Sequence, residues 1–330
     1  MAEFHSIRLF PKHQGADAYR LSGIAKLCDW VITSDSRPPH IHLWKLREAE
    51  RPKTIFLSLR SPEVAIEYFS ESIRPSLKSP IVLVTGSEDV TVPRQLDARW
   101  PSFSAAHVAL LRTLTSDPII YHWFAENLDE DLGQAVSPLP LGMVYQDPEA
   151  DRKIRLPKTP PCAERDLRVL CAHRVREGPQ WALRKKISYW ARTSWSEFCD
   201  VIEDEMSEED YFSEVMSRSF VICAEGGGLD PSPKAWQTLL HGSIPIIRKT
   251  PASLAYTVFP CVFVDEWHEN CVSLQQLERY KSLFGSWFDS PRLRARVIER
   301  LGLDYWWSKI HKKISELGAV GELLTDKKCI

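Results

Sequence analysis

SFVICAEGGGLDPSPKAWQTLLHGSIPIIRKTPASLAYTVFPCVFV, residues 219–264, is the stretch of the chain that decides its fold. The apolar run 220–223 has the length and residue types of a strand, and the glycines 226–228 follow it. A helix is predicted next, with Asp230 as a candidate N-cap and Gly242 as the residue that ends it. The run 244–247 predicts a second strand. Strand, loop, helix and strand form a βαβ unit, whose ligands bind at the carboxyl ends of the strands.

The glycine loop of this unit predicts an anion site. Glycines let backbone amides approach a ligand, and a helix that begins beside them directs free N–H groups at it. A plain strand-to-helix turn is the alternative interpretation. The dinucleotide-binding spacing lacks its third glycine, and no P-loop motif occurs. The residues expected to contact a diphosphate, a ribose and a sugar are Glu225, Gly227, Gly228, Asp230, Ser232, Lys234 and Gln237.

The segment SFVICAEGGGLD, followed by Lys234, Gln237 and GSIPII, resembles the donor-binding half of the exostosin-type glycosyltransferases. The resemblance implies an α/β fold of the GT-B type, in which two Rossmann-like domains face each other across a cleft. It also implies transfer of a sugar from a UDP- or GDP-linked donor to an oligosaccharide or glycan acceptor. The nucleotide sugar is then a co-substrate, and no separate cofactor is expected.

Two residues depart from the pattern of that family. Lys234 stands where the family usually carries Arg, and Gln237 stands where it usually carries Glu. Lys neutralises a phosphate as a point charge, and Gln still accepts a hydrogen bond from a hydroxyl. Nucleotide binding is therefore still expected, while the base and the sugar stay open.

A length of 330 residues predicts two domains. We expect an acceptor-side domain at 1–150 and a nucleotide-sugar-binding domain at 151–330, joined by a linker rich in Pro and charge at 146–165. Under the resemblance, the helical tail 274–317 can cross back to the first domain. Strands are predicted at 40–44, 54–59, 80–85, 119–123, 167–172 and 261–265, and helices at 61–73, 103–115 and 180–192.

Two residues outside the glycine loop have predicted roles. Arg174 follows the strand 167–172 and is expected to help neutralise the diphosphate, whereas Lys185 and Lys186 are interpreted as a solvated helix face. Asp89 follows the strand 80–85 and is the candidate base that takes the acceptor proton in an inverting transfer. Asp35 and His107 are the alternatives to Asp89, and each of these roles competes with a purely structural one.

Residues 129–131 match the acidic motif with which many glycosyltransferases hold a divalent ion. They follow an amphipathic segment rather than a strand, so we interpret them as an exposed acidic loop. Lys234, Arg174 and the helix terminus would balance the diphosphate, which predicts metal-independent transfer.

Composition narrows the function classes. A net charge of −2 provides no electrostatic reason to expect nucleic acid. The chain has neither an apolar run of about 18 residues nor a signal peptide, so no transmembrane segment is expected. Its eight cysteines form no CxxC pair, which favours a reduced, cytoplasmic compartment without a structural metal. Three other functions stay open: an inactive glycan- or nucleotide-binding relative, an oxidoreductase, and an α/β protein without a small ligand.

Overall fold

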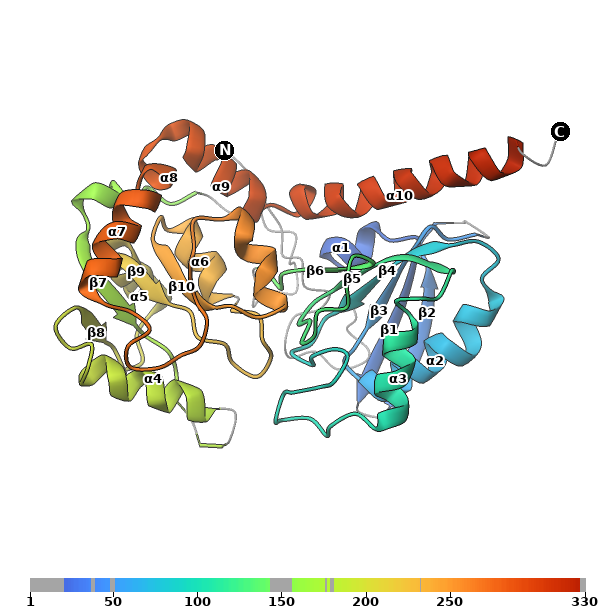
Figure 1. Ribbon diagram of the computed structural model, residues 1–330, viewed down its shortest axis with the longest axis horizontal. Helices are drawn as coiled ribbons and strands as arrows, with labels where there is room; N and C mark the ends of the chain where they lie inside the picture. Colours follow the sequence, from blue (N-terminus) through green and yellow to red (C-terminus); the bar gives the residue numbers. More distant parts are fainter. Residues whose placement is uncertain are drawn as a thin grey trace. The chain divides into compact units, whose positions relative to one another are not determined.

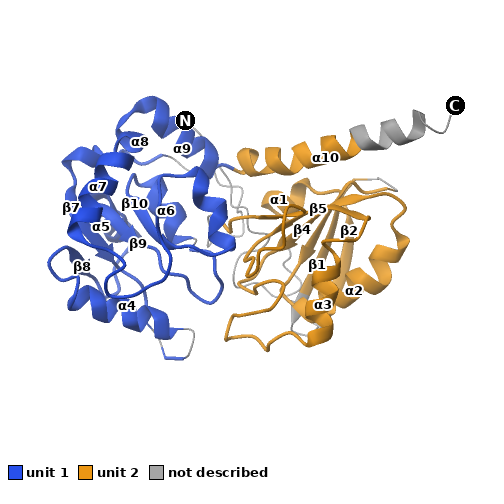
Figure 2. Cartoon of the chain, viewed as in Figure 1, with its two compact units in different colours: residues 1–4, 153–302 blue, residues 5–152, 303–330 orange. Residues whose placement is uncertain are grey.

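The computed structural model describes residues 21–36, 39–47, 51–142, 156–175, 177–178, 181–231 and 233–326, without the side chains of 35, 36, 39 and 319–326 (Figure 1). The chain divides into two compact units (Figure 2). Unit 1 comprises residues 1–4 and 153–302, and unit 2 comprises residues 5–152 and 303–330. Each unit has one mainly parallel sheet with helices against it, which confirms the predicted α/β class with two Rossmann-like domains. Half of the predicted linker, residues 146–155, lies outside the described residues, and the other half includes a short 3-10 turn.

The sheet of unit 2 has the order β2-β1-β3-β4-β5-β6, and all its strands are parallel except β2, which is antiparallel to β1. Strands β3 and β4 are buried along their whole length, as expected for a sheet covered on both faces. The strand β1 was not predicted. Its first half is apolar, but its second half, TSDS, is polar, so the segment as a whole lacks the pattern of a buried strand. The strands are β1 (Trp30–Ser36), β2 (Pro39–Lys45), β3 (Thr54–Ser58), β4 (Ile81–Gly86), β5 (Ile120–Ala125) and β6 (Val136–Pro138).

Helices cover both faces of this sheet (Figure 1). On one face, α2 and α3 bury Ile66, Phe69 and Leu111 in a core with Ile55 and Leu57. On the other face, α10 packs against β4 and β5 and contacts α1. The helices are α1 (Gly23–Leu27), α2 (Pro62–Tyr68, extended by a π-helical turn, Phe69–Ile73), α3 (Ala105–Thr113) and α10 (Leu303–Asp326).

The sheet of unit 1 is parallel and has the order β11-β10-β9-β7-β8. The chain starts at β7, adds β8 on one side, and then adds β9, β10 and β11 on the other. Winding therefore reverses between β7 and β9, and ligands of open α/β sheets bind at the carboxyl side of such a switch point. The strands are β7 (Asp166–Cys171), β8 (Cys199–Val201), β9 (Arg218–Ile222), β10 (Ile244–Arg248) and β11 (Val262–Val264).

The helices of unit 1 follow from this winding. Right-handed crossovers place α4 on one face of the sheet and α5 and α6 on the other. The predicted helical tail is divided among several helices, and the last of them, α10, belongs to unit 2. The helices of unit 1 are α4 (Ala182–Arg192), α5 (Glu208–Ser217), α6 (Lys234–Leu240), α7 (Leu274–Phe284), α8 (Ser286–Asp289) and α9 (Pro291–Leu301), with 3-10 turns at Cys162–Glu164 and Ala252–Val258.

Helix α6 begins at Lys234, four residues after the predicted N-cap. Its N-cap position is Pro233, and no side chain caps it. The predicted N-cap, Asp230, instead accepts a hydrogen bond of 2.7 Å from the Tyr256 hydroxyl. The predicted end is correct, because Gly242 has a φ of +79°, a conformation that glycine adopts without strain.

Two arginines, the buried Arg165 and the half-buried Arg294, cap the carboxyl end of α6. Arg165 donates to the carbonyl of His241 at 2.9 Å, and Arg294 donates to the carbonyls of Leu239, at 2.6 Å, and Leu240. A Cβ on Gly242 would lie 2.7 Å from the Arg165 guanidinium, so only glycine leaves room for this contact. Cations at the last carbonyls of a helix also oppose the negative end of its dipole. Both arginines therefore hold α6 in place.

Arg294→Ala should destabilise the fold, because the last carbonyls of α6 lose a charged donor. We expect a loss of about 1.5–3 kcal/mol in the free energy of unfolding, measured by urea denaturation. Arg292→Ala is the matched control on the same helix. That side chain is exposed, so its removal should cost less than about 0.5 kcal/mol. Equal losses in the two variants would contradict the capping role.

Candidate functional site

The loops after β7 and β9 lie next to each other at the switch point of unit 1. The first continues with Ala172 and His173, and the second with Cys223 and the glycine loop. The ammonium group of Lys234, the first residue of α6, donates a hydrogen bond to the Ala172 carbonyl. The helix that follows β9 is thus tied to the end of β7.

A second connection runs through α4. The ring Nε2 of His173 lies 3.0 Å from the Arg184 carbonyl. A carbonyl only accepts, so His173 carries its proton on Nε2. The Arg184 guanidinium in turn donates to the carbonyl of Glu225 at 3.1 Å and to that of Ala224 at 3.3 Å. Together with the bond from Lys234, these contacts join the β7 loop, α4, the glycine loop and α6 in a closed ring, named here the switch-point ring.

Gly226 packs closely against this ring. A Cβ at this position would lie 3.1 Å from Nη2 of Arg184, which is closer than side chains usually pack. Gly226 does not have a positive φ, so its role here is to leave space for the guanidinium.

Two cations therefore lie at the switch point, Arg184 on the glycine loop and Lys234 on the loop after β7. Burial, with a smaller contribution from the charge of Arg184, lowers the pKa of Lys234 to about 8. Arg184 also stacks on the Trp181 ring, with its Cζ 4.9 Å from the ring centroid. An anion bound between Lys234 and Arg184 would relieve the repulsion between them.

The carboxylates of the loop have protein partners. Glu225 is buried, accepts a hydrogen bond of 3.0 Å from the Trp267 indole, and forms an ion pair with Arg248. Asp230 is also buried and accepts from Tyr256. Through these contacts both carboxylates hold the loop in place, whatever further contacts they make with a ligand.

The other predicted residues differ in their surroundings. Gly228 is buried, whereas Gly227 is partly exposed. Gln237 lies one helical turn after Lys234, and its side chain makes no hydrogen bond to a described residue.

Arg174 lies at the same edge of the sheet, but it is exposed and points to Glu205, 3.5 Å away. Ser232 lies outside the described residues.

Sequence reasoning missed Arg184, which reaches the glycine loop where Arg174 does not. A signal was present: Trp181, Arg184 and Ser188 recur at helical spacing, and Ser188 is buried. The face of α4 that carries them therefore packs inward. Lys185 is on the outside, as predicted, and pairs with the exposed Glu177 at 3.0 Å.

The candidate bases of unit 2 are held in ion pairs or hydrogen bonds. Asp89 lies 2.5 Å from Nη2 of Arg99, which also pairs with the buried Asp97. The ring nitrogens of His107 lie 2.9 Å from the Ser104 hydroxyl and 3.0 Å from Glu67. The side chain of Asp35 is outside the described residues.

The interpretation of 129–131 as an exposed acidic loop is wrong for Asp129. This residue is 3% exposed and accepts hydrogen bonds from the Thr91 hydroxyl, at 2.6 Å, and the backbone N–H of Gln95, at 3.1 Å. Its carboxylate anchors the loop that follows β4, and only Asp131 is fully exposed. Within the described residues, no cluster of His, Cys, Asp and Glu is suited to a metal ion.

Unit 2 also has a buried polar network at the carboxyl ends of its strands. The hydroxyls of Ser58 and Ser87 lie 2.7 Å apart, and the Ser87 amide donates to Glu126 at 2.8 Å. A Cβ on Gly86 would overlap the Glu126 carboxyl group. The network joins the ends of β3, β4 and β5, and no motif in the sequence predicted it.

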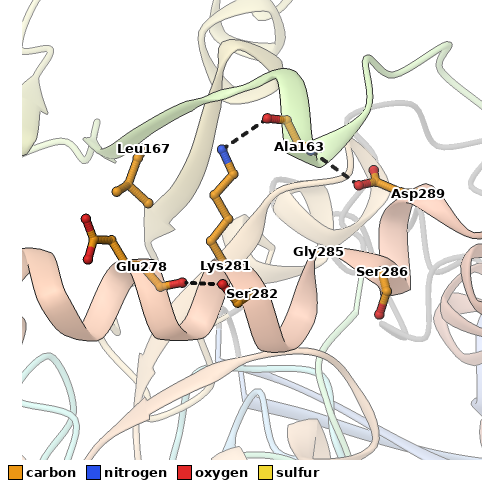
Figure 3. A pocket seen from close by; sticks show the side chains of 8 residues that line it. All are labelled: Ala163, Leu167, Glu278, Lys281, Ser282, Gly285, Ser286 and Asp289. Atoms are coloured by element: carbon orange, nitrogen blue, oxygen red, sulfur yellow. Dashed lines mark hydrogen bonds between the residues drawn. The ribbon is translucent and has the colours of Figure 1, made fainter.

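A pocket of about 480 Å³ lies elsewhere in unit 1, at the amino end of β7 (Figure 3). Lys281 donates to the carbonyl of Arg165 at 2.5 Å, and Asp289 accepts from the amide of Cys162 at 2.5 Å. These charges hold the 3-10 turn against α7 and α8. The pocket lies at the opposite edge of the sheet from the switch-point ring.

No family model and no curated protein matches the sequence. Among solved structures, it is similar to α,α-trehalose 6-phosphate synthase from Burkholderia multivorans, at 9% identity and a TM-score of 0.40, over 81% of this chain and 72% of that one. A glycosyltransferase from Rickettsia africae ESF-5 has 8% identity and a TM-score of 0.38, over 80% and 76%. An α-glucosyltransferase in complex with UDP-glucose and DNA containing an abasic site has 10% identity and a TM-score of 0.36, over 80% of each chain. Because these TM-scores and sequence identities are low, we infer the function of this chain from its own residues.

Lys234→Met should change how stability depends on pH. Burial lowers the pKa of Lys234 from 10.5 to about 8, so between these values the unfolded chain binds more protons at this side chain than the folded chain. The stability of the natural chain relative to the variant should therefore rise with pH across this window, by about 1–3 kcal/mol. Urea unfolding at a series of pH values measures the difference. A difference that does not change with pH would contradict the buried, destabilised ammonium.

Proposed function

We propose that unit 1 binds a nucleotide-diphosphate sugar at the switch-point ring and that the chain transfers the sugar to an acceptor hydroxyl. The observation that carries the proposal is that two cations lie at the switch point of a parallel sheet, Arg184 on the glycine loop and Lys234 on the loop after β7. A diphosphate carries the charge that two cations can stabilise, and the loop amides supply further donors.

The same groups would act on the reaction. When the bond between the sugar and the phosphate breaks, negative charge builds on the diphosphate oxygens. Lys234, Arg184 and the loop amides would stabilise that charge in the transition state. Arg174 would be a further cation at this edge. With this charge already supplied, we propose transfer without a divalent ion.

The sugar and ribose contacts are assigned by position. Gln237 follows Lys234 by one turn and offers an uncharged amide to a hydroxyl. Glu225, Asp230, Ser232, Gly227 and Gly228 complete the proposed set. A UDP- or GDP-linked donor, an oligosaccharide or glycan acceptor, membership of the exostosin-type family and a cytoplasmic location are parts of the same proposal. The described part of the chain includes no helix that could span a membrane.

We propose that Asp89 of unit 2 is the base that removes the acceptor proton in an inverting transfer. Its carboxylate is already paired with the Arg99 guanidinium, 2.5 Å away. This contact favours one second candidate: a relative that binds the nucleotide or a glycan without transferring the sugar.

Lys234→Ala and Arg184→Ala should each weaken nucleotide binding, because each removes a cation from the diphosphate. We expect the Kd for UDP or GDP to rise about 10- to 100-fold, measured by titration calorimetry. Lys185→Ala is the control, since its ammonium pairs with Glu177 away from the loop. Normal affinity in Lys234→Ala would show that the anion is bound elsewhere.

Asp89→Asn should leave nucleotide affinity nearly intact while transfer falls by about two to four orders of magnitude. A panel of UDP- and GDP-sugars with oligosaccharide acceptors, assayed in excess EDTA, measures the transfer. Near-normal transfer by the variant would remove Asp89 as the base. Activity that is lost in EDTA and restored by Mn²⁺ would contradict metal independence. A natural chain that binds nucleotide but transfers nothing would favour the second candidate.

A further inference from the structure

Tyr211 on α5 has a buried hydroxyl that makes no hydrogen bond within the described part of the chain. Burial raises the pKa of Tyr211 well above its usual value, so the group stays a protonated donor. Leaving such a donor without a partner costs about 1–3 kcal/mol, which phenylalanine at this position would avoid.

Other buried aromatic side chains of unit 1 show the contrast. Tyr256 donates its hydroxyl to Asp230 at 2.7 Å. The indole N–H groups of Trp195 and Trp236 donate to backbone carbonyls at 2.6 Å and 3.2 Å. Tyr211 is thus an exception among them.

Its position connects Tyr211 with the switch-point ring. The Lys234 ammonium lies over the Tyr211 ring, 5.9 Å from its centroid. The next residue, Phe212, stacks on His241 with 4.0 Å between ring centroids, and this contact fixes α5 beside α6. The unused donor is therefore held beside one of the two cations of the proposed diphosphate site.

We propose that the Tyr211 hydroxyl donates a hydrogen bond to a diphosphate oxygen of the bound nucleotide. This inference rests on the proposed function. In the free chain, Lys234 is held on the Ala172 carbonyl and covers the ring. When its ammonium turns toward the anion, the ring is uncovered and the hydroxyl gains the acceptor that the free chain does not provide.

Tyr211→Phe tests the inference, because it should affect stability and binding in opposite directions. The unfolding midpoint of the free chain should stay the same or rise. The Kd for UDP or GDP and the Kd for inorganic pyrophosphate should each increase about 5- to 20-fold. Calorimetry on the full chain measures both constants.

Two tyrosine variants serve as controls. Tyr189→Phe changes an exposed hydroxyl on α4 and should alter neither stability nor affinity. Tyr256→Phe removes a satisfied hydroxyl and should lower the unfolding midpoint. The second control shows that the stability measurement can detect a single lost hydrogen bond.

The other outcomes separate the two proposals. If the natural chain binds neither UDP nor GDP, the proposed function fails and this inference fails with it. If the natural chain binds nucleotide and Tyr211→Phe binds it equally well, only this inference fails. A loss of UDP affinity without a loss of pyrophosphate affinity would place the contact on the ribose or base and overturn the assignment to the diphosphate. A lower unfolding midpoint would show that the hydroxyl serves the fold.

Discussion

The hydrogen bond from the Lys234 ammonium to the Ala172 carbonyl is the contact on which the site depends. It joins the first turn of α6 to the end of β7, across the point where the winding of the sheet reverses. Burying an ammonium group is costly, which is why the pKa of Lys234 is lowered. The free-energy cost of burying the ammonium arises at the place where an anionic ligand would offset it. A buried charged group with a shifted pKa, placed where a ligand of opposite charge could bind, is typical of binding sites.

The rest of unit 1 keeps this contact in place. Arg165 and Arg294 hold the carboxyl end of α6, so the helix cannot slide along the sheet. Glu225 and Asp230 fasten the glycine loop to side chains behind it. The glycine loop and Arg184 are thus positioned before any ligand arrives. A preorganised site binds more tightly, because less order has to be created on binding.

How far the sequence predicted this arrangement depends on the kind of feature. The βαβ unit was predictable, because strand runs, the glycine loop and Gly242 are local signals. The sequence did not predict which basic side chain reaches the loop, because that depends on how α4 packs against the neighbouring strand loops. Arg174 follows the strand directly and still points away, whereas Arg184 arrives from a helix. The predicted N-cap role of Asp230 and the predicted exposure of Asp129 were wrong for the same reason: the partners of these residues, Tyr256 and Thr91, are distant in sequence.

The central claim is that a nucleotide binds at the carboxyl edge of the sheet in unit 1, and hydrogen–deuterium exchange of the full chain tests it most directly. With UDP or GDP bound, the backbone amides of residues 223–231 and 172–175 should exchange more slowly than in the free chain. The loop of unit 2 at 87–97 should show no comparable change. Protection confined to unit 2, with the glycine loop unchanged, would contradict the account.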